Sequence, residues 1–199
     1  GSSVAEARAD EVTISGQVYR LYQATLGRAP DAGGFIGWFN GLAEGRLQLE
    51  QTAAAFVNSR EFQSVYGSLT NAEFVELLYQ NVLGRSADAG GLANWTARLD
   101  GGATRASVVL GFSESAEFQR NSTAGMDSFM RAGNLRWNDA IEGGAGNDTV
   151  NGGTGSDTFI FRRGAGGADV INGFEPWDKL QLSGFGFVTA ADARARMVQ

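Results

Sequence analysis

The residues best suited to chemistry in this chain are aspartates that follow glycine clusters at a fixed spacing. Residues 143–151 read Gly-Gly-Ala-Gly-Asn-Asp-Thr-Val-Asn, and residues 152–160 read Gly-Gly-Thr-Gly-Ser-Asp-Thr-Phe-Ile. Glycine allows the backbone to turn through positive φ and to aim its carbonyl oxygens inward. With a carboxylate at the sixth position, such loops offer the oxygen ligands that Ca²⁺ prefers. The pattern therefore predicts calcium sites in loops.

Degenerate copies extend the pattern on both sides. Residues 134–142 lack the glycines but keep Asp139 and the apolar Ile141, and residues 164–172 keep Asp169 after a three-residue insertion. Asp178 follows, and it either caps the last calcium loop or is an ordinary turn residue. The apolar eighth position predicts a short strand with a side chain in a core. The candidate calcium ligands are Asp139, Gly144, Gly146, Asp148, Gly153, Gly155, Asp157, Asp169 and Asp178.

Composition excludes several classes of function. The chain has no cysteine and no histidine, which excludes disulfides, the usual zinc sites and imidazole-based catalytic triads. Its net charge is −6 and no basic run occurs, so we expect no binding to nucleic acid. No apolar run approaches the ~20 residues of a membrane span. We find no convincing pair of carboxylates for acid–base catalysis, and we predict that the chain is not an enzyme.

The N-terminal two thirds contain an internal repeat. The residue types between Tyr22 and Gly45 recur between Tyr79 and Gly102, at an offset of 57 residues (79 minus 22). After a deletion of one residue the repeat continues at an offset of 56, so that Phe56 recurs as Phe112 (112 minus 56). Apolar residues recur at i, i+3, i+4 and i+7 in both copies, which is typical of amphipathic helices. The repeat therefore predicts a helix cluster that is used twice.

Local signals place the ends of these helices. Gly27 and Gly84 suit the left-handed position that ends a helix, and Asp31 and Asp88 suit the N-cap of the next one. Further helices are expected over 53–57 and 108–112, with short ones over 59–66 and 115–120, and Thr70 with Glu73 forms a capping box.

The repeated aromatic and charged residues allow two interpretations. Trp38 and Trp95 lie on the apolar face of their helices, which favours a place in the core over a stacking platform for a sugar ring. The spacing of Arg28 with Asp31, and of Arg85 with Asp88, favours local ion pairs that brace the turn over a ligand site.

Two resemblances follow from these motifs. The run Tyr22…Leu26-Gly27-Arg28-Ala29-Pro30-Asp31-Ala32-Gly33-Gly34…Trp38, which is repeated with Ser86-Ala87 in place of Ala29-Pro30, resembles a tandem helical domain of unknown function. That domain occurs in secreted and surface-layer proteins of Gram-negative bacteria and is distantly similar to phycobilisome linker domains. The nonapeptides and the segment 169–185 resemble the repeats-in-toxin (RTX) calcium-binding β-roll of type I secreted bacterial proteins.

The RTX resemblance implies a specific geometry. Two nonapeptides make one coil, so Asp139 is expected to face Asp157, and Asp148 to face Asp169. The roll is expected to close on antiparallel strands, followed by an uncleaved C-terminal export signal that this chain carries only in part. Without calcium the roll is expected to be expanded or unfolded, because its stacked aspartates repel one another.

Together these observations predict an α+β protein with two segregated domains, an all-α helix cluster built from two repeats and a parallel β-roll. Residues 1–12 are expected to be a tag or flexible lead, 13–132 the helical domain, 133–187 the calcium-binding roll and 188–199 a tail.

We expect an extracellular or cell-surface location without a cleaved N-terminal signal. The expected function is a calcium-binding surface or adhesion module whose helical domain contacts a cell-surface polysaccharide or surface protein. The alternatives are a non-catalytic accessory region of a larger secreted hydrolase, or a structural surface-layer subunit that self-associates.

Overall fold

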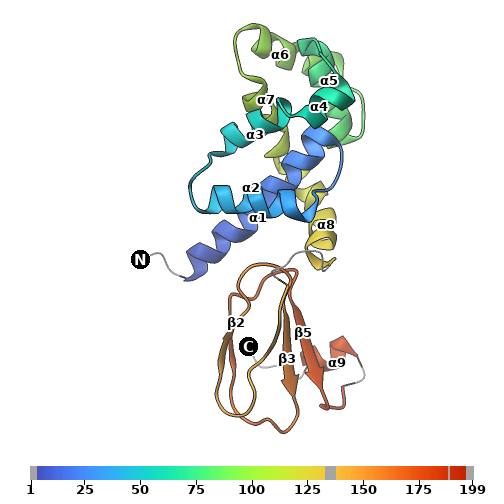
Figure 1. The fold of residues 1–199 in the computed structure, drawn as a ribbon. Coiled ribbons are helices and arrows are strands. Elements are labelled where there is room, and N and C mark those ends of the chain that lie inside the picture. Colours follow the sequence, from blue (N-terminus) through green and yellow to red (C-terminus); the bar gives the residue numbers. More distant parts are fainter. Residues whose placement is uncertain (1–3, 133–137, 188, 196–199) are drawn as a thin grey trace. The chain divides into compact units, whose positions relative to one another are not determined.

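The computed structural model describes residues 4–132, 138–187 and 189–195. The chain forms two compact units, one of residues Ala9–Phe129 and one that holds the strands after Met130 (Figure 1). The first is a helix cluster and the second consists of short parallel strands, which confirms the predicted fold class. No helix in the described part of the chain combines the length and the apolar character needed to cross a membrane.

The helical unit contains two successive sets of helices. The helices of the first set are α1 (Val4–Leu26), α2 (Ala32–Ala43), α3 (Leu49–Val57) and α4 (Arg60–Tyr66). Those of the second set are α5 (Asn71–Leu83), α6 (Ala89–Asp100), α7 (Arg105–Ser113) and α8 (Ala116–Arg131). Helix α3 packs on α7, and α5 packs on α6 and α7.

Two expectations about helix length are wrong. Helix α1 begins at Val4, so residues 4–12 are helical and not a flexible lead, while residues 1–3 lie outside the described part. Helix α8 continues well past the short helix expected over 115–120. Its later residue Phe129 packs edge-on against Phe35, with the ring centroids 5.0 Å apart, so tertiary packing supports the extra turns.

The internal repeat is visible in the geometry of the helix ends. Gly27 and Gly84 have φ values of 65° and 64°, as the left-handed position requires. Asp31 accepts a hydrogen bond from Gly34 N at 2.8 Å, and Asp88 accepts one from Gly91 N at 2.9 Å. The predicted helix ends and N-caps are therefore confirmed, as is the capping box at the start of α5.

Aromatic contacts also recur between the two sets. The Tyr22 and Phe56 rings lie 4.7 Å apart and edge-on, and their counterparts Tyr79 and Phe112 lie 5.1 Å apart. Trp38 packs at 5.3 Å from Phe56, and Trp95 at 5.0 Å from Phe112. Both tryptophans are half-buried, so they belong to the packing without being fully enclosed.

Arg28 forms two ion pairs that brace the turn between α1 and α2. Its Nε lies 2.6 Å from Glu61 Oε1, and its Nη2 lies 3.6 Å from Asp31 Oδ1. The predicted local pair with Asp31 is present, and the closer partner is the glutamate in α4. The fully buried side chains of the helical unit include Leu21, Phe35, Phe62, Phe74 and Leu78.

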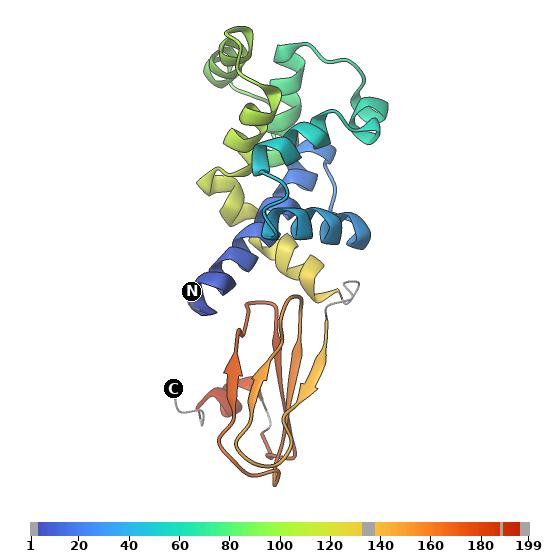
Figure 2. The same cartoon turned by 60° about the vertical axis from the view of Figure 1, so that its left-hand side comes forward.

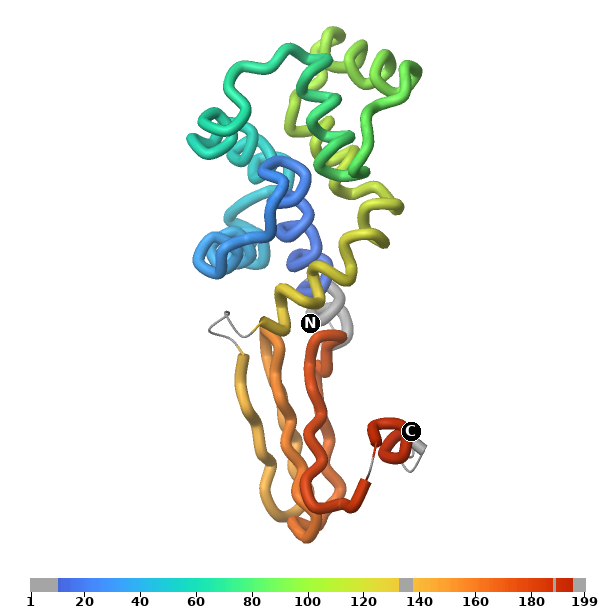
Figure 3. Tube along the Cα trace, turned by 90° about the vertical axis from the view of Figure 1, so that its right-hand side faces the viewer, coloured from blue at the N-terminus to red at the C-terminus, as the bar shows by residue number. Residues whose placement is uncertain are grey.

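The second unit is a roll of short parallel strands. They are β1 (Ala140–Glu142), β2 (Thr149–Asn151), β3 (Thr158–Arg162), β4 (Val170–Asn172) and β5 (Lys179–Ser183). One sheet has the order β1-β3-β5 and the other pairs β2 with β4 (Figure 2). Because consecutive strands alternate between the sheets, the chain winds through successive coils, as Figure 3 shows.

The register of the strands confirms that two nonapeptides make one coil. Ala140 pairs with Thr158, which is 18 residues (158 minus 140) later. Thr149 pairs with Val170 and Thr158 with Lys179, each 21 residues later (170 minus 149 and 179 minus 158) because of the three-residue insertion. Eighth-position side chains consequently stack, as Ile141, Phe159 and Leu180 in one sheet and Val150 and Ile171 in the other.

The expected antiparallel closure is wrong for the described residues. Strand β5 lies parallel to β3 and extends the first sheet by another coil. The physical reason is that residues 173–181 repeat the spacing of the nonapeptides, with Gly173 first, Asp178 sixth and Leu180 eighth. Helix α9 (Ala190–Ala195) follows, whereas residues 188 and 196–199 of the expected tail lie outside the described part.

Candidate calcium-binding edges of the roll

The glycine-rich loops gather at the two opposite ends of the strands (Figure 2). We call one end the 157 edge, which comprises Asp139 and the loops 152–157 and 173–178. We call the other the 148 edge, which comprises the loops 143–148 and 164–169. Each edge stacks loops that belong to successive coils.

The 157 edge is a ladder of aspartates. The backbone N–H of Asp139 donates to Asp157 Oδ1 at 2.8 Å, and the N–H of Asp157 donates to Asp178 Oδ1 at 2.9 Å. The backbone N–H groups that follow bond back, from Thr158 to the Asp139 carbonyl and from Lys179 to the Asp157 carbonyl, both at 2.8 Å. Asp139 and Asp157 thus face each other as expected.

The 148 edge has the same arrangement, with one hydrogen bond between successive aspartates where the 157 edge has two. The N–H of Asp148 donates to Asp169 Oδ1 at 3.0 Å, and the N–H of Val170 donates to the Asp148 carbonyl at 2.8 Å. The second expected pair of aspartates is therefore also brought together. The N–H of Gly146 also donates to the Gly166 carbonyl at 3.0 Å, so the two glycine loops touch along their backbones.

The two complete nonapeptides each contain a buried carboxylate oxygen that has no hydrogen-bond partner within the described residues. These atoms are Asp148 Oδ2 and Asp157 Oδ2. Each lies against the first glycine of its own repeat. A methyl group would approach Asp148 Oδ2 to 3.1 Å from Gly143 and Asp157 Oδ2 to 2.3 Å from Gly152. A buried polar atom without a partner is costly, and a cation would remove that cost. The residues of the complete repeats therefore fit calcium.

Asp178 differs from these two aspartates. Its Oδ2 accepts a hydrogen bond from the backbone N–H of Glu175 at 2.7 Å, inside a loop that contains Phe174 and Pro176 in place of glycines. Both of its carboxylate oxygens therefore already bind backbone N–H groups. Of the two interpretations of Asp178, the structure favours the turn residue.

Sequence reasoning missed polar residues that hold the loops in register. Asn138 Oδ1 accepts from the Ser156 N–H at 2.8 Å, and Asn147 Oδ1 accepts from the Ala168 N–H at 2.9 Å. Both asparagines precede a sixth-position aspartate, so the recurrence of asparagine at the fifth position of two repeats was the available signal. It also missed the buried pair in which Trp177 Nε1 donates to Glu175 Oε2 at 2.7 Å.

An ion at either edge would take most of its ligands from the backbone. Among the described residues, no three acidic side chains converge on one point. The predicted glycine ligands instead have positive φ, with values of 93° at Gly144, 116° at Gly146, 81° at Gly153 and 105° at Gly155. Such backbone can present carbonyl oxygens, and Ca²⁺ accepts six to eight oxygen ligands in irregular geometry. The role of each predicted ligand stays a prediction.

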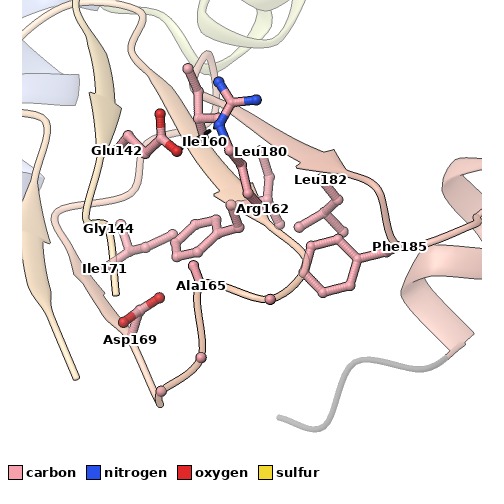
Figure 4. A pocket seen from close by; sticks show the side chains of 14 residues that line it. Glu142, Gly144, Ile160, Arg162, Ala165, Asp169, Ile171, Leu180, Leu182 and Phe185 are labelled. Atoms are coloured by element: carbon pink, nitrogen blue, oxygen red, sulfur yellow. Dashed lines mark hydrogen bonds and ion pairs between the residues drawn. The ribbon is translucent and has the colours of Figure 1, made fainter. Parts of the chain in front are cut away.

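Apolar residues lie behind the 148 edge. A cavity of about 470 Å³ between the sheets is lined by the loop 164–167, Asp169 and the side chains of Ile171, Leu182 and Phe185 (Figure 4). It arises where β3 and β5, with five residues each, extend past β2 and β4, with three. The ion pair of Arg162 with Glu142, 2.6 Å from Nε to Oε1, lies at its margin. The edge therefore has an apolar interior on one side.

The electrostatics of the 157 edge centre on Asp157, which is fully buried. Burial raises the pKa of its carboxyl group to about 6. The hydrogen bond from Asp139 N–H lowers this pKa, and the neighbouring charges of Asp178 and Asp139 raise it. Because the unfolded value is ~3.9, the ion-free roll binds an extra proton between the two pKa values and loses that stabilisation as pH rises through about 6.

Calcium binding at the 157 edge should therefore weaken on acidification. Between pH 7 and pH 5 the Asp157 carboxyl group changes from mostly ionised to mostly protonated, so the dissociation constant should rise by about tenfold. Calorimetric titration at the two pH values measures this change. The Asp157→Asn variant lacks this ligand and cannot titrate there, so the calcium binding that remains at its 148 edge is the control and should change less with pH. An equal pH dependence in both proteins would contradict the assignment.

The comparisons with known proteins agree with these features. Residues 53–122 match the family model described as domain of unknown function DUF4214, a range that runs from within α3 into α8. Residues 138–166 match the RTX calcium-binding nonapeptide repeat, a range that includes Asp139, Asp148 and Asp157 but neither Asp169 nor Asp178. No curated protein matches the chain.

The RTX match bears on the ion and on the class of protein. RTX repeats bind calcium as a structural ion, not as a catalytic cofactor, and they are typical of type I secreted extracellular proteins. The chain thus carries a DUF4214 domain followed by RTX calcium-binding nonapeptide repeats.

Proposed function

We propose that this chain is a secreted, non-catalytic module whose roll folds when it meets extracellular calcium and whose helical domain contacts a cell-surface glycan or protein. The observation that carries the first part is the pair of buried, unpartnered oxygens Asp148 Oδ2 and Asp157 Oδ2 in the two complete repeats. Without a partner, these buried oxygens destabilise the folded roll, and calcium binding removes that destabilisation.

The expected calcium affinity makes the folding of the roll depend on whether it is inside or outside the cell. Extracellular calcium modules bind at ~10⁻⁴–10⁻³ M, far above the free calcium concentration of a cytosol. Inside the cell, repulsion along Asp139, Asp157 and Asp178 and the unpartnered oxygens would keep the roll open. An open chain suits passage through a type I secretion channel, and folding would follow outside.

Two carboxylates of the helical domain support a non-catalytic role because they bind backbone N–H groups, one in a helix cap and one in the loop before α6. Glu73 accepts from the Thr70 N–H at 2.8 Å, and this backbone hydrogen bond lowers its pKa. Glu76 accepts from the Ala87 N–H at 3.1 Å, with the same effect on its pKa. A general acid requires a raised pKa, so neither side chain is suited to that role.

Binding to cell-surface material tests the contact role. Labelled protein in millimolar calcium should bind whole cells of the bacterium that encodes it, before and after protease treatment of the cells, and should bind their extracted polysaccharide. Binding that survives protease treatment identifies the glycan, and binding that is lost identifies a surface protein. No binding to either form of the cells would overturn the contact role and leave calcium-dependent folding to be judged separately.

A further inference from the structure

The helical unit contains a cleft of about 260 Å³ between α1 and α8. Its lining includes Val12, Thr13, Gly16 and Arg20 of α1 and Gln119 and Thr123 of α8. We propose that this cleft binds one ring of a hydroxyl-rich ligand of the sugar class. The inference rests on the proposed glycan contact of the helical domain and gives that contact a site.

The cleft contains a buried arginine whose hydrogen bonding is incomplete. Arg20 is 8% exposed, and its Nε donates to the Ser113 carbonyl at 2.9 Å and to Glu114 Oε1 at 3.3 Å. Its Nη2 donates to Glu114 Oε2 at 2.7 Å. Arginine has five N–H donors, and within the described part of the chain Nη1 donates to no protein atom. Nη1 is not among the buried atoms without a partner, so it reaches the open space of the cleft and is available to donate to a ligand there.

A glycine inside α1 gives Nη1 its place in the cleft. A methyl group at Gly16 would lie 2.7 Å from Arg20 Nη1, which is closer than the two atoms can approach. Glycine in a helix interior costs ~1 kcal/mol relative to alanine. Here it leaves the space that the guanidinium group occupies.

The other polar groups make the cleft suited to hydroxyls. Ser122 Oγ and Thr123 Oγ1 donate to the Gln119 carbonyl at 3.3 and 2.9 Å, so their oxygens remain as acceptors for a ligand. Glu114 balances the charge of Arg20, and an anion would meet this carboxylate. A hydroxyl group both donates and accepts, and it therefore matches this mixture of donors and acceptors.

The size and the apolar lining of the cleft narrow the ligand class further. Val12 and Met126 offer apolar surface to the carbon face of a ring. A volume of about 260 Å³ is below the ~300–1,000 Å³ of sites for drug-sized ligands, so it suits a single ring.

The internal repeat shows that this arrangement is not part of the shared scaffold. The position of Arg20 corresponds to Leu77 (77 minus 20 is 57), and that of Glu114 corresponds to Asn58 (114 minus 58 is 56). The helix caps and aromatic contacts recur in both sets of helices, whereas the arginine–glutamate pair occurs in one. The fold of the repeat therefore does not require this pair.

Nuclear magnetic resonance on the full chain in calcium tests the proposal. The Arg20 Nε–Hε signal is followed while methyl glycosides of glucose, galactose, mannose and N-acetylglucosamine are added, with sodium acetate as the anionic probe. We expect at least one glycoside to shift this signal to saturation, and acetate to leave it unchanged. A shift by acetate alone, or by none of the glycosides, overturns the proposal.

Three variants separate binding from folding. Gly16→Ala should weaken glycoside binding at least tenfold because the methyl group displaces Nη1, while alanine supports the helix. Gly37→Ala, in α2 with open space around the added methyl group, is the matched control and should bind normally. Thr13→Val removes a hydroxyl group from the lining and should weaken binding without touching the Arg20–Glu114 pair.

The same variants distinguish the failure of this site from the failure of the proposed function. If Gly16→Ala still binds the extracted polysaccharide as the unchanged protein does, the contact role stands and this cleft is not its site. If glycosides shift the Arg20 signal while the protein binds neither cells nor polysaccharide, the cleft is a sugar-binding site, but the proposed contact with the cell surface is wrong.

Discussion

Removal of calcium should unfold the roll while the helices persist. Without an ion, the buried oxygens Asp148 Oδ2 and Asp157 Oδ2 have no partner among the described residues, and stacked carboxylates repel each other. In millimolar calcium, a site with a dissociation constant of ~10⁻⁴ M contributes about 1.4 kcal/mol. The roll is small and its strands have only three to five residues, so its core leaves little stability with which to offset the loss of two such contributions.

Tryptophan residues report on the two units separately. Trp177 is 1% exposed in the roll, whereas Trp38 and Trp95 lie half-buried in the helix cluster. In protein labelled with fluorotryptophan, addition of a chelator should move the Trp177 fluorine signal to its solvent-exposed position and leave those of Trp38 and Trp95 in place. Circular dichroism should keep the helical signal and lose the strand signal. The Trp177→Phe variant assigns the reporter.

A double variant tests whether the calcium response of the roll depends on Asp148 and Asp157. Asp148→Asn with Asp157→Asn removes two charges and the carboxylate oxygens proposed to bind the ion, so its Trp177 signal should respond little to calcium. If the unchanged protein keeps its Trp177 signal in chelator, the ion is not required for folding, and the proposed switch between compartments fails.

The parts of the fold that were predicted correctly depend on short-range or periodic signals. Caps such as Asp31 and Asp88 act within one helical turn, so the local sequence determines them. The pairing of Asp139 with Asp157 follows from a spacing of two nonapeptides, because a repeat that winds into coils returns each position to the same edge.

The features that were missed depend on contacts between distant residues. Arg20 and Glu114 are 94 residues apart and follow no repeat, so no pattern connects them. The extension of α8 depends on Phe129 packing against Phe35, again across most of the helical domain. The parallel placement of β5 did have a signal in the spacing of Gly173, Asp178 and Leu180, but the missing glycines between them concealed it.

The glycines of the RTX loops have two distinct physical roles, and the 148 edge separates them. Gly166 and Gly167 are neighbours, and both have positive φ, 71° and 117°. An added methyl group meets nothing within 4 Å at Gly166, whereas at Gly167 it would lie 1.6 Å from the carbonyl oxygen of Gly146. Gly166 therefore supplies only a backbone conformation, while Gly167 also allows the two coils to approach each other.

Gly167→Ala should consequently destabilise the roll far more than Gly166→Ala. Strain at a positive φ costs ~1–3 kcal/mol, which applies to both variants. Gly167→Ala must in addition separate the loops, which breaks the hydrogen bond from Gly146 N to Gly166 O and the facing of Asp148 and Asp169, a further ~1–3 kcal/mol. In saturating calcium, the melting temperature reported by Trp177 should fall by a further ~4–24 °C relative to that of Gly166→Ala, since 1 kcal/mol shifts a domain of this size by ~4–8 °C. Equal melting of the two variants would show that the loops of the 148 edge do not touch, and the calcium site proposed between them would have no structural basis.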